Sequence, residues 1–176
     1  MSASPFVTDW SARLAPREGS VRRALDLAMG RGRHAVVLAR HGFRTYGVDE
    51  RLDAVREAVT VAARERLTVR GWCADLTMFP LPPEAFDLMV VTRYLQRDLW
   101  PSIRRAVTPG GCVIYETFTV LQRALGTGPT SDDHLLECGE LRASFPEWDV
   151  LFDEEVAAPE AVARLVARKP RVSRPP

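Results

Sequence analysis

Two glycines and two aspartates carry the clearest chemical pattern in this chain. Gly30 and Gly32, one residue apart, interrupt an apolar run, and a backbone without side chains can pass close to a ligand. Asp49 ends the next apolar run, where its carboxylate can accept hydrogen bonds from both hydroxyls of a ribose. Asp75 follows the run after that and can accept a hydrogen bond from an adenine amino group while Leu76 packs on the ring. The pattern favours an adenosyl ligand.

Each of these residues also has an ordinary structural interpretation. A glycine turn joins strand to helix in many α/β proteins, Asp49 suits the N-cap of the helix expected from residue 51, and Asp75 suits a turn. An adenosyl ligand explains the four residues together better than these separate roles do.

Charge near the glycine turn bears on what the adenosine is attached to. The turn also has the spacing of a dinucleotide fingerprint, which would hold a pyrophosphate. Asp26, four residues before Gly30, would repel a pyrophosphate but attract the ammonium and sulfonium groups of S-adenosylmethionine. Arg31 and Arg33 favour a phosphate instead. We give Asp26 the greater weight and expect S-adenosylmethionine.

These residues need a scaffold that brings strand ends together. Short apolar runs alternate with helical patterns, which is typical of a parallel α/β sheet whose ligands lie beyond the carboxyl ends of the strands. We expect one domain over 1–176, with an N-terminal segment over about 1–20 containing a helix over 8–14, and a flexible tail over 169–176. Strands are expected at 24–28, 44–48, 68–73, 87–92, 112–117, 148–152 and 161–167. Helices are expected at 34–41, from 52 and from about 99, the last ended by Pro109-Gly110-Gly111.

The ordered motifs resemble those of class I S-adenosylmethionine-dependent methyltransferases. They are Asp26-Leu-Ala-Met-Gly-Arg-Gly-Arg-His-Ala35, Gly47-Val-Asp49, Ala74-Asp75-Leu76, Phe86-Asp87-Leu-Met-Val-Val91, Pro109-Gly-Gly111 and Tyr115-Glu-Thr-Phe118. The resemblance spans about residues 20–156, and the branch it resembles most contains the small bacterial tellurite-resistance and thiopurine-methyltransferase-like proteins.

The resemblance implies a fold, a cofactor and a product. The fold is a Rossmann-like, mostly parallel seven-stranded sheet flanked by helices, with its last strand antiparallel, and S-adenosyl-L-homocysteine is the product. The cofactor-binding positions are Asp26, Ala28, Met29, Gly30, Gly32, Asp49, Glu50, Asp75, Leu76 and Thr92. Ala28 stands where many members have glycine, and Met29 stands where a small residue is usual, so Met29 is expected to narrow the methionine end of the pocket.

The methyl acceptor should be held by residues that follow the fourth and fifth strands. Arg93 and Tyr94 could orient it, Glu116 could act as a base or an anchor, and His134 could move a proton; each also has an ordinary packing or surface interpretation. Arg97 and Arg123, with Arg93, could receive an anionic acceptor. In-line methyl transfer can rely largely on positioning.

Composition narrows the partners. A formal charge of +1 gives no global field for nucleic acid or membranes, so we expect a small-molecule acceptor. The absence of a signal-peptide layout or long apolar run favours a cytoplasmic protein, as a monomer or a homodimer. Three scattered cysteines predict no metal site. The alternatives are a non-catalytic or degenerate S-adenosylmethionine-binding protein and, less favoured, an NAD(P)-dependent oxidoreductase.

Overall fold

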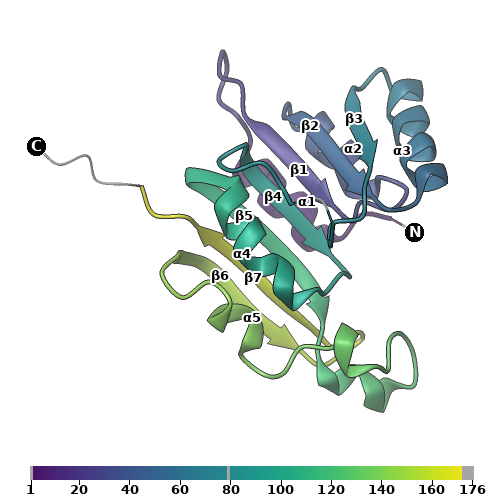
Figure 1. The fold of residues 1–176 in the computed structure, drawn as a ribbon, viewed down its shortest axis with the longest axis vertical. Coiled ribbons are helices and arrows are strands. Elements are labelled where there is room, and N and C mark those ends of the chain that lie inside the picture. The colour runs from purple at the N-terminus through teal and green to yellow at the C-terminus, as the bar shows by residue number, and fades with distance from the viewer. Residues whose placement is uncertain (1, 79, 172–176) are drawn as a thin grey trace, which may run out of the picture.

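A seven-stranded sheet runs through the protein in the order β3-β2-β1-β4-β5-β7-β6 (Figure 1). The computed structural model describes residues 2–78 and 80–171. Strand β7 is antiparallel to both of its neighbours, and the other pairs are parallel. The strands are β1 (Arg23–Leu27), β2 (Arg44–Asp49), β3 (Val69–Cys73), β4 (Phe86–Thr92), β5 (Val107–Phe118), β6 (Asp149–Val156) and β7 (Val162–Arg168). The predicted fold is confirmed.

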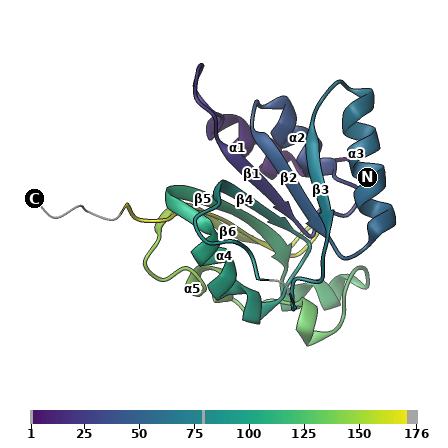
Figure 2. The same cartoon turned by 45° about the horizontal axis from the view of Figure 1, so that its top comes forward.

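Helices cover both faces of the sheet (Figure 2). One face carries α1 (Pro5–Arg13), α2 (Arg33–Arg40) and α3 (Leu52–Arg64). The other carries α4 (Trp100–Ala106) and α5 (Glu140–Ala143). The described residues also form three short 3₁₀ helices, η1 (Arg97–Leu99), η2 (Val120–Leu125) and η3 (Asp132–His134). The apolar run over residues 88–91 of β4 is buried between the two layers, as expected of a strand covered on both faces.

The helix α4 ends earlier than the sequence suggested. Pro109-Gly110-Gly111 was expected to end it, but α4 ends at Ala106 and β5 begins at once. The register jumps from Phe86 opposite Val107 to Leu88 opposite Cys112, so residues 108–111 bulge from the pairing. Gly110 has a φ of 78°, a left-handed conformation that costs glycine little. The motif therefore shapes an irregularity at the start of β5.

Both ends of the described chain are attached to the sheet. Helix α1 begins at Pro5, before the expected residue 8, because proline suits the first helical position, and it buries Val7. The expected tail over 169–176 is partly corrected, since the backbone N–H of Lys169 donates to Gly111 O at 2.8 Å and its ammonium donates to Val107 O at 2.8 Å. Residues 172–176 lie outside the described residues.

Candidate functional site

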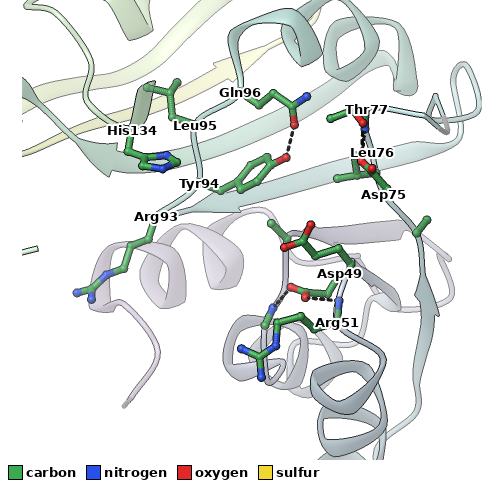
Figure 3. Close-up of a pocket in the computed structure, with 14 residues that line it drawn as sticks. Asp49, Arg51, Asp75, Leu76, Thr77, Arg93, Tyr94, Leu95, Gln96 and His134 are labelled. Carbon is green, nitrogen blue, oxygen red and sulfur yellow. Dashed lines mark hydrogen bonds between the residues drawn. The ribbon is translucent and has the colours of Figure 1, made fainter. Parts of the chain in front are cut away.

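A cavity of about 510 Å³ lies where the carboxyl ends of β1 to β4 meet (Figure 3). Its lining includes six of the predicted cofactor positions, namely Ala28, Gly30, Asp49, Glu50, Asp75 and Leu76. Arg93, Tyr94 and His134 line the same cavity, from beyond the end of β4 and from η3, although the Arg93 guanidinium points away from Tyr94 (Figure 3). The parallel topology thus brings together residues that are far apart in the sequence.

The turn after β1 gives its two glycines different roles. A Cβ added to Gly30 would meet no atom within 4 Å, so its backbone faces open space at the cavity. A Cβ on Gly32 would lie 2.5 Å from the Cβ of Ala58, so this glycine lets α2 pack closely on α3. Ala28, with a φ of 53°, holds a left-handed conformation that is costly for an L-residue, which explains why glycine is common there.

Asp49 ties the ends of two strands together. Its Oδ2 accepts a hydrogen bond from the backbone N–H of Gly30 at 2.7 Å, and its Oδ1 accepts one from the N–H of Arg51 at 3.0 Å. The N-cap of α3 is Arg51 and makes no side-chain capping bond, so Asp49 is not the helix cap. The neighbouring Glu50 is exposed on the cavity wall, and its carboxylate has no partner within the described part of the chain.

Asp75 and Leu76 form the opposite end of this cavity with Tyr94. Asp75 Oδ1 accepts hydrogen bonds from Thr77 Oγ1 at 2.7 Å and Thr77 N at 2.8 Å, which lower the pKa of Asp75. Tyr94 is half-buried and donates to Gln96 Oε1. Burial, followed by the charge of Glu50, raises the pKa of Tyr94, so its phenol stays protonated at neutral pH.

A second cavity of about 360 Å³ extends from Ala28 and Gly30 toward Thr92 and Arg33. The Thr92 hydroxyl lies 3.0 Å from His34 Nδ1, while the backbone N–H of Ser4 donates to His34 Nε2 at 3.0 Å. Because Nε2 is an acceptor, the ring proton is on Nδ1 and is donated to Thr92. Burial, then the charges of Arg33 and Arg93, lower the pKa of His34 to about 3.

Asp26 is not brought to either cavity. Its carboxyl is 1% exposed, Oδ2 accepts from the backbone N–H of Ala35 at 2.8 Å, and Oδ1 has no partner among the described residues. Burial raises the pKa of Asp26 to about 7. The carboxyl therefore holds the first turn of α2 against β1, and it does not line the cavity where a direct ligand contact was expected.

Met29 does not narrow the pocket as expected. It borders the second cavity, but its side chain is 5% exposed and packs in the cluster formed by α2, α3 and β3. A Cβ on Gly47 would lie 2.0 Å from Met29 Sδ, and one on Gly71 would lie 3.3 Å from Met29 Cε. Met29 fills the space that two strand glycines leave open.

Three of the four residues predicted to hold the methyl acceptor meet at a third cavity of about 320 Å³. Arg93, Tyr94 and His134 line it together with Phe118 and Pro129. Glu116 is not brought there: it is 7% exposed and accepts a hydrogen bond from Arg164 Nε at 2.7 Å.

The arginines suggested as anion receptors already face carboxylates. Arg93 donates twice to Glu160, at 2.7 and 2.8 Å. Arg97 pairs with Glu140 and Arg123 pairs with Asp132. Sequence reasoning missed Gln96 and the role of His34, because only the turn after β4 and the packing of α1 bring these two residues near the site.

The methyltransferase domain family matches residues 24–111, which is half of the chain. The chain belongs to this family. The matched residues include the glycine turn and the ends of β1 to β4, which line the first cavity, of about 510 Å³. The family implies S-adenosylmethionine as the methyl donor.

Solved structures with low sequence identity share the fold. TehB from Haemophilus influenzae is 16% identical with a TM-score of 0.76, over 95% of this chain and 62% of that one. A SAM-dependent methyltransferase from Methanosarcina mazei is 16% identical with a TM-score of 0.73, over 98% and 100% of the chains. The [4+2]-cyclase SpnF is 20% identical with a TM-score of 0.75, over 94% and 80%. No curated protein matches, and no helix among residues 2–78 and 80–171 is long and apolar enough to cross a membrane.

The residues present fit the implied cofactor. Gly30 leaves open space for a ligand, and Asp49, Glu50 and Asp75 place carboxylates along one wall of the large cavity. Leu76 offers an apolar contact there. Arg31, which suggested a phosphate, lies against Glu57 at 3.2 Å, so its charge is partly offset.

Proposed function

We propose that this protein binds S-adenosylmethionine across the first two cavities. The carboxylates of Glu50 and Asp49 hold the ribose hydroxyls, and Asp75 with Leu76 holds the adenine. The methionine end lies past Gly30 toward Thr92. The observation that carries the proposal is that the 510 and 360 Å³ cavities share Ala28, Gly30 and Arg93, which gives one ligand path around the glycine turn.

We further propose that the methyl acceptor is a small molecule held in the third cavity, which shares Arg93 with the second and Tyr94 and His134 with the first. When bound, S-adenosylmethionine supplies an electrophilic methyl group on a sulfonium. Phe118 and Pro129 exclude water from the acceptor, and Tyr94 orients it. His134 takes a proton from acceptors that must lose one, and positioning supplies much of the rate.

The third cavity suits an acceptor that is a small, largely uncharged molecule. The guanidinium of Arg93 is paired with Glu160, and the lining around it is aromatic and apolar. We place the reaction in the cytoplasm, in a monomer or a homodimer, with no nucleic-acid or membrane partner.

Calorimetry with S-adenosylmethionine, S-adenosylhomocysteine and NAD tests the cofactor. We expect Glu50→Gln to weaken S-adenosylhomocysteine at least tenfold, or about 1.4 kcal/mol, because it removes a charged acceptor from the ribose site. Glu18→Gln, which removes the same charge from an exposed turn, is the matched control. Tight binding of NAD, with no binding of S-adenosylmethionine or S-adenosylhomocysteine, would refute the proposal.

A labelled-methyl screen over thiols, small phenols and metalloid oxyanions tests catalysis. Transfer to a phenol or thiol, with a loss in His134→Gln that shrinks as pH rises, supports His134 as the base. Tight binding of S-adenosylhomocysteine with no transfer to any acceptor class favours the non-catalytic alternative.

A further inference from the structure

A cavity of about 420 Å³ lies at the edge of the sheet opposite the proposed cofactor site. It forms where β1, β4 and β5 begin and β7 ends. Among the residues that the structure describes, four arginines line it, and Asp87 is the one carboxylate on its wall. The arginines are Arg17, Arg22, Arg168 and Arg171.

The charge of these four arginines is only partly offset, because Asp87 brings a single negative charge to the cavity wall. Within the described residues, Arg17, Arg168 and Arg171 make no side-chain hydrogen bond or ion pair. Asp87 is occupied on both oxygens, since Oδ2 accepts from the backbone N–H of Arg23 at 2.7 Å and Oδ1 accepts from Thr108 Oγ1 at 3.2 Å. The cavity therefore carries a net positive charge.

Arg22 is fixed in place without losing its charge. Its guanidinium donates to the backbone carbonyl of Leu14 at 2.6 Å and to that of Asp87 at 3.2 Å, and it lies over the ring of Phe43. Carbonyl oxygens orient a guanidinium but do not neutralise it. Elsewhere in the chain arginines are commonly paired, as Arg40 is with Glu65.

We propose that this cavity binds the phosphate groups of a small phosphorylated molecule. Guanidinium groups bind phosphate oxygens in a bidentate geometry, and several around one hollow favour a multivalent anion. The concave shape selects a compact ligand, and bringing four like charges together is costly unless an anion joins them. The inference is independent of the proposed methyl transfer, because it concerns the other edge of the sheet.

Titration calorimetry with inorganic pyrophosphate tests this site at fixed ionic strength. We expect saturable binding that weakens at least tenfold in the double variant Arg168→Gln/Arg171→Gln. Arg56→Gln/Arg64→Gln, which removes the same charge from the exposed surface of α3, should stay within twofold of the unaltered chain. If the first variant unfolds, Arg17→Gln on the exposed turn gives the same comparison with a smaller loss.

Several results would overturn the proposal. Absence of pyrophosphate binding, or equal weakening in both double variants, would show that no specific site exists. Loss of binding in Arg31→Gln instead would place pyrophosphate at the glycine turn after β1. Citrate binding as tightly as pyrophosphate would overturn the assignment to phosphate.

Discussion

Two buried groups near the glycine turn should give opposite pH dependence to stability. Burial lowers the pKa of His34 from 6.5 to about 3, so the unfolded chain binds a proton there that the native chain does not. The free energy of unfolding must then fall as pH drops from 6.5 toward 3. Burial raises the pKa of Asp26 from 3.8 to about 7, so the native chain keeps a proton that the unfolded chain releases, and stability rises as pH drops from 7 toward 3.8.

The two effects are similar in size between pH 7 and pH 5. Each is about 2 kcal/mol over this range, worked from the two shifts by proton linkage. They nearly cancel in the unaltered chain. In Asp26→Asn only the His34 effect remains. The free energy of unfolding of this variant should therefore fall by about 2 kcal/mol from pH 7 to pH 5, whereas that of the unaltered chain changes little. His34→Gln should gain about 2 kcal/mol over the same range.

Urea unfolding of the three chains at pH 5, 6 and 7 measures these differences. Asparagine keeps an acceptor for the N–H of Ala35, and glutamine keeps one for Ser4, so the substitutions remove titration while the main hydrogen bonds stay. Curves for the variants that run parallel to that of the unaltered chain across this range would refute the reasoning.

The glycines make further expectations testable by urea unfolding. Gly32→Ala should cost roughly 2–5 kcal/mol, because it combines a left-handed φ of 75° with a clash against Ala58, whereas Gly30→Ala should cost only about 1–2 kcal/mol. Equal costs would contradict the separate roles given to these glycines. Gly47→Ala should cost about 1–3 kcal/mol through its clash with Met29. In a double-mutant cycle, most of that cost should vanish in a Met29→Ala background, and simple additivity would count against this packing.

The sequence allowed the fold to be predicted because its signals are local and repeated. The apolar runs of β1, β2 and β4 and the helical spacing of α3 each reflect burial of one element against the sheet. The start of β5 was missed because Pro109-Gly110-Gly111 is a helix stop in isolation. Only its pairing with β4 makes it a bulge within a strand.

The sequence predicted which residues line the cavity wherever a position after a strand end is enough to place a residue there. Glu50, Leu76 and His134 follow or lie beyond strand ends and reach the cavity for that reason. The directions of Asp26 and Met29 depend on packing partners that are distant in sequence, such as Gly47, which spacing cannot reveal. Whether these residues bind a cofactor stays a prediction.

The hydrogen bond from Ser4 to His34 connects α1 to the edge of the sheet where the cavities lie. The imidazole joins the amino end of α1 to the last residue of β4, Thr92, through its two nitrogens. We therefore expect a ligand that contacts Thr92 to stabilise the docking of α1, and the docking of α1 to raise the affinity for that ligand by the same free energy. Ser4 lies far in sequence from the second cavity, yet its contact with His34 gives α1 a route by which to influence ligand binding there.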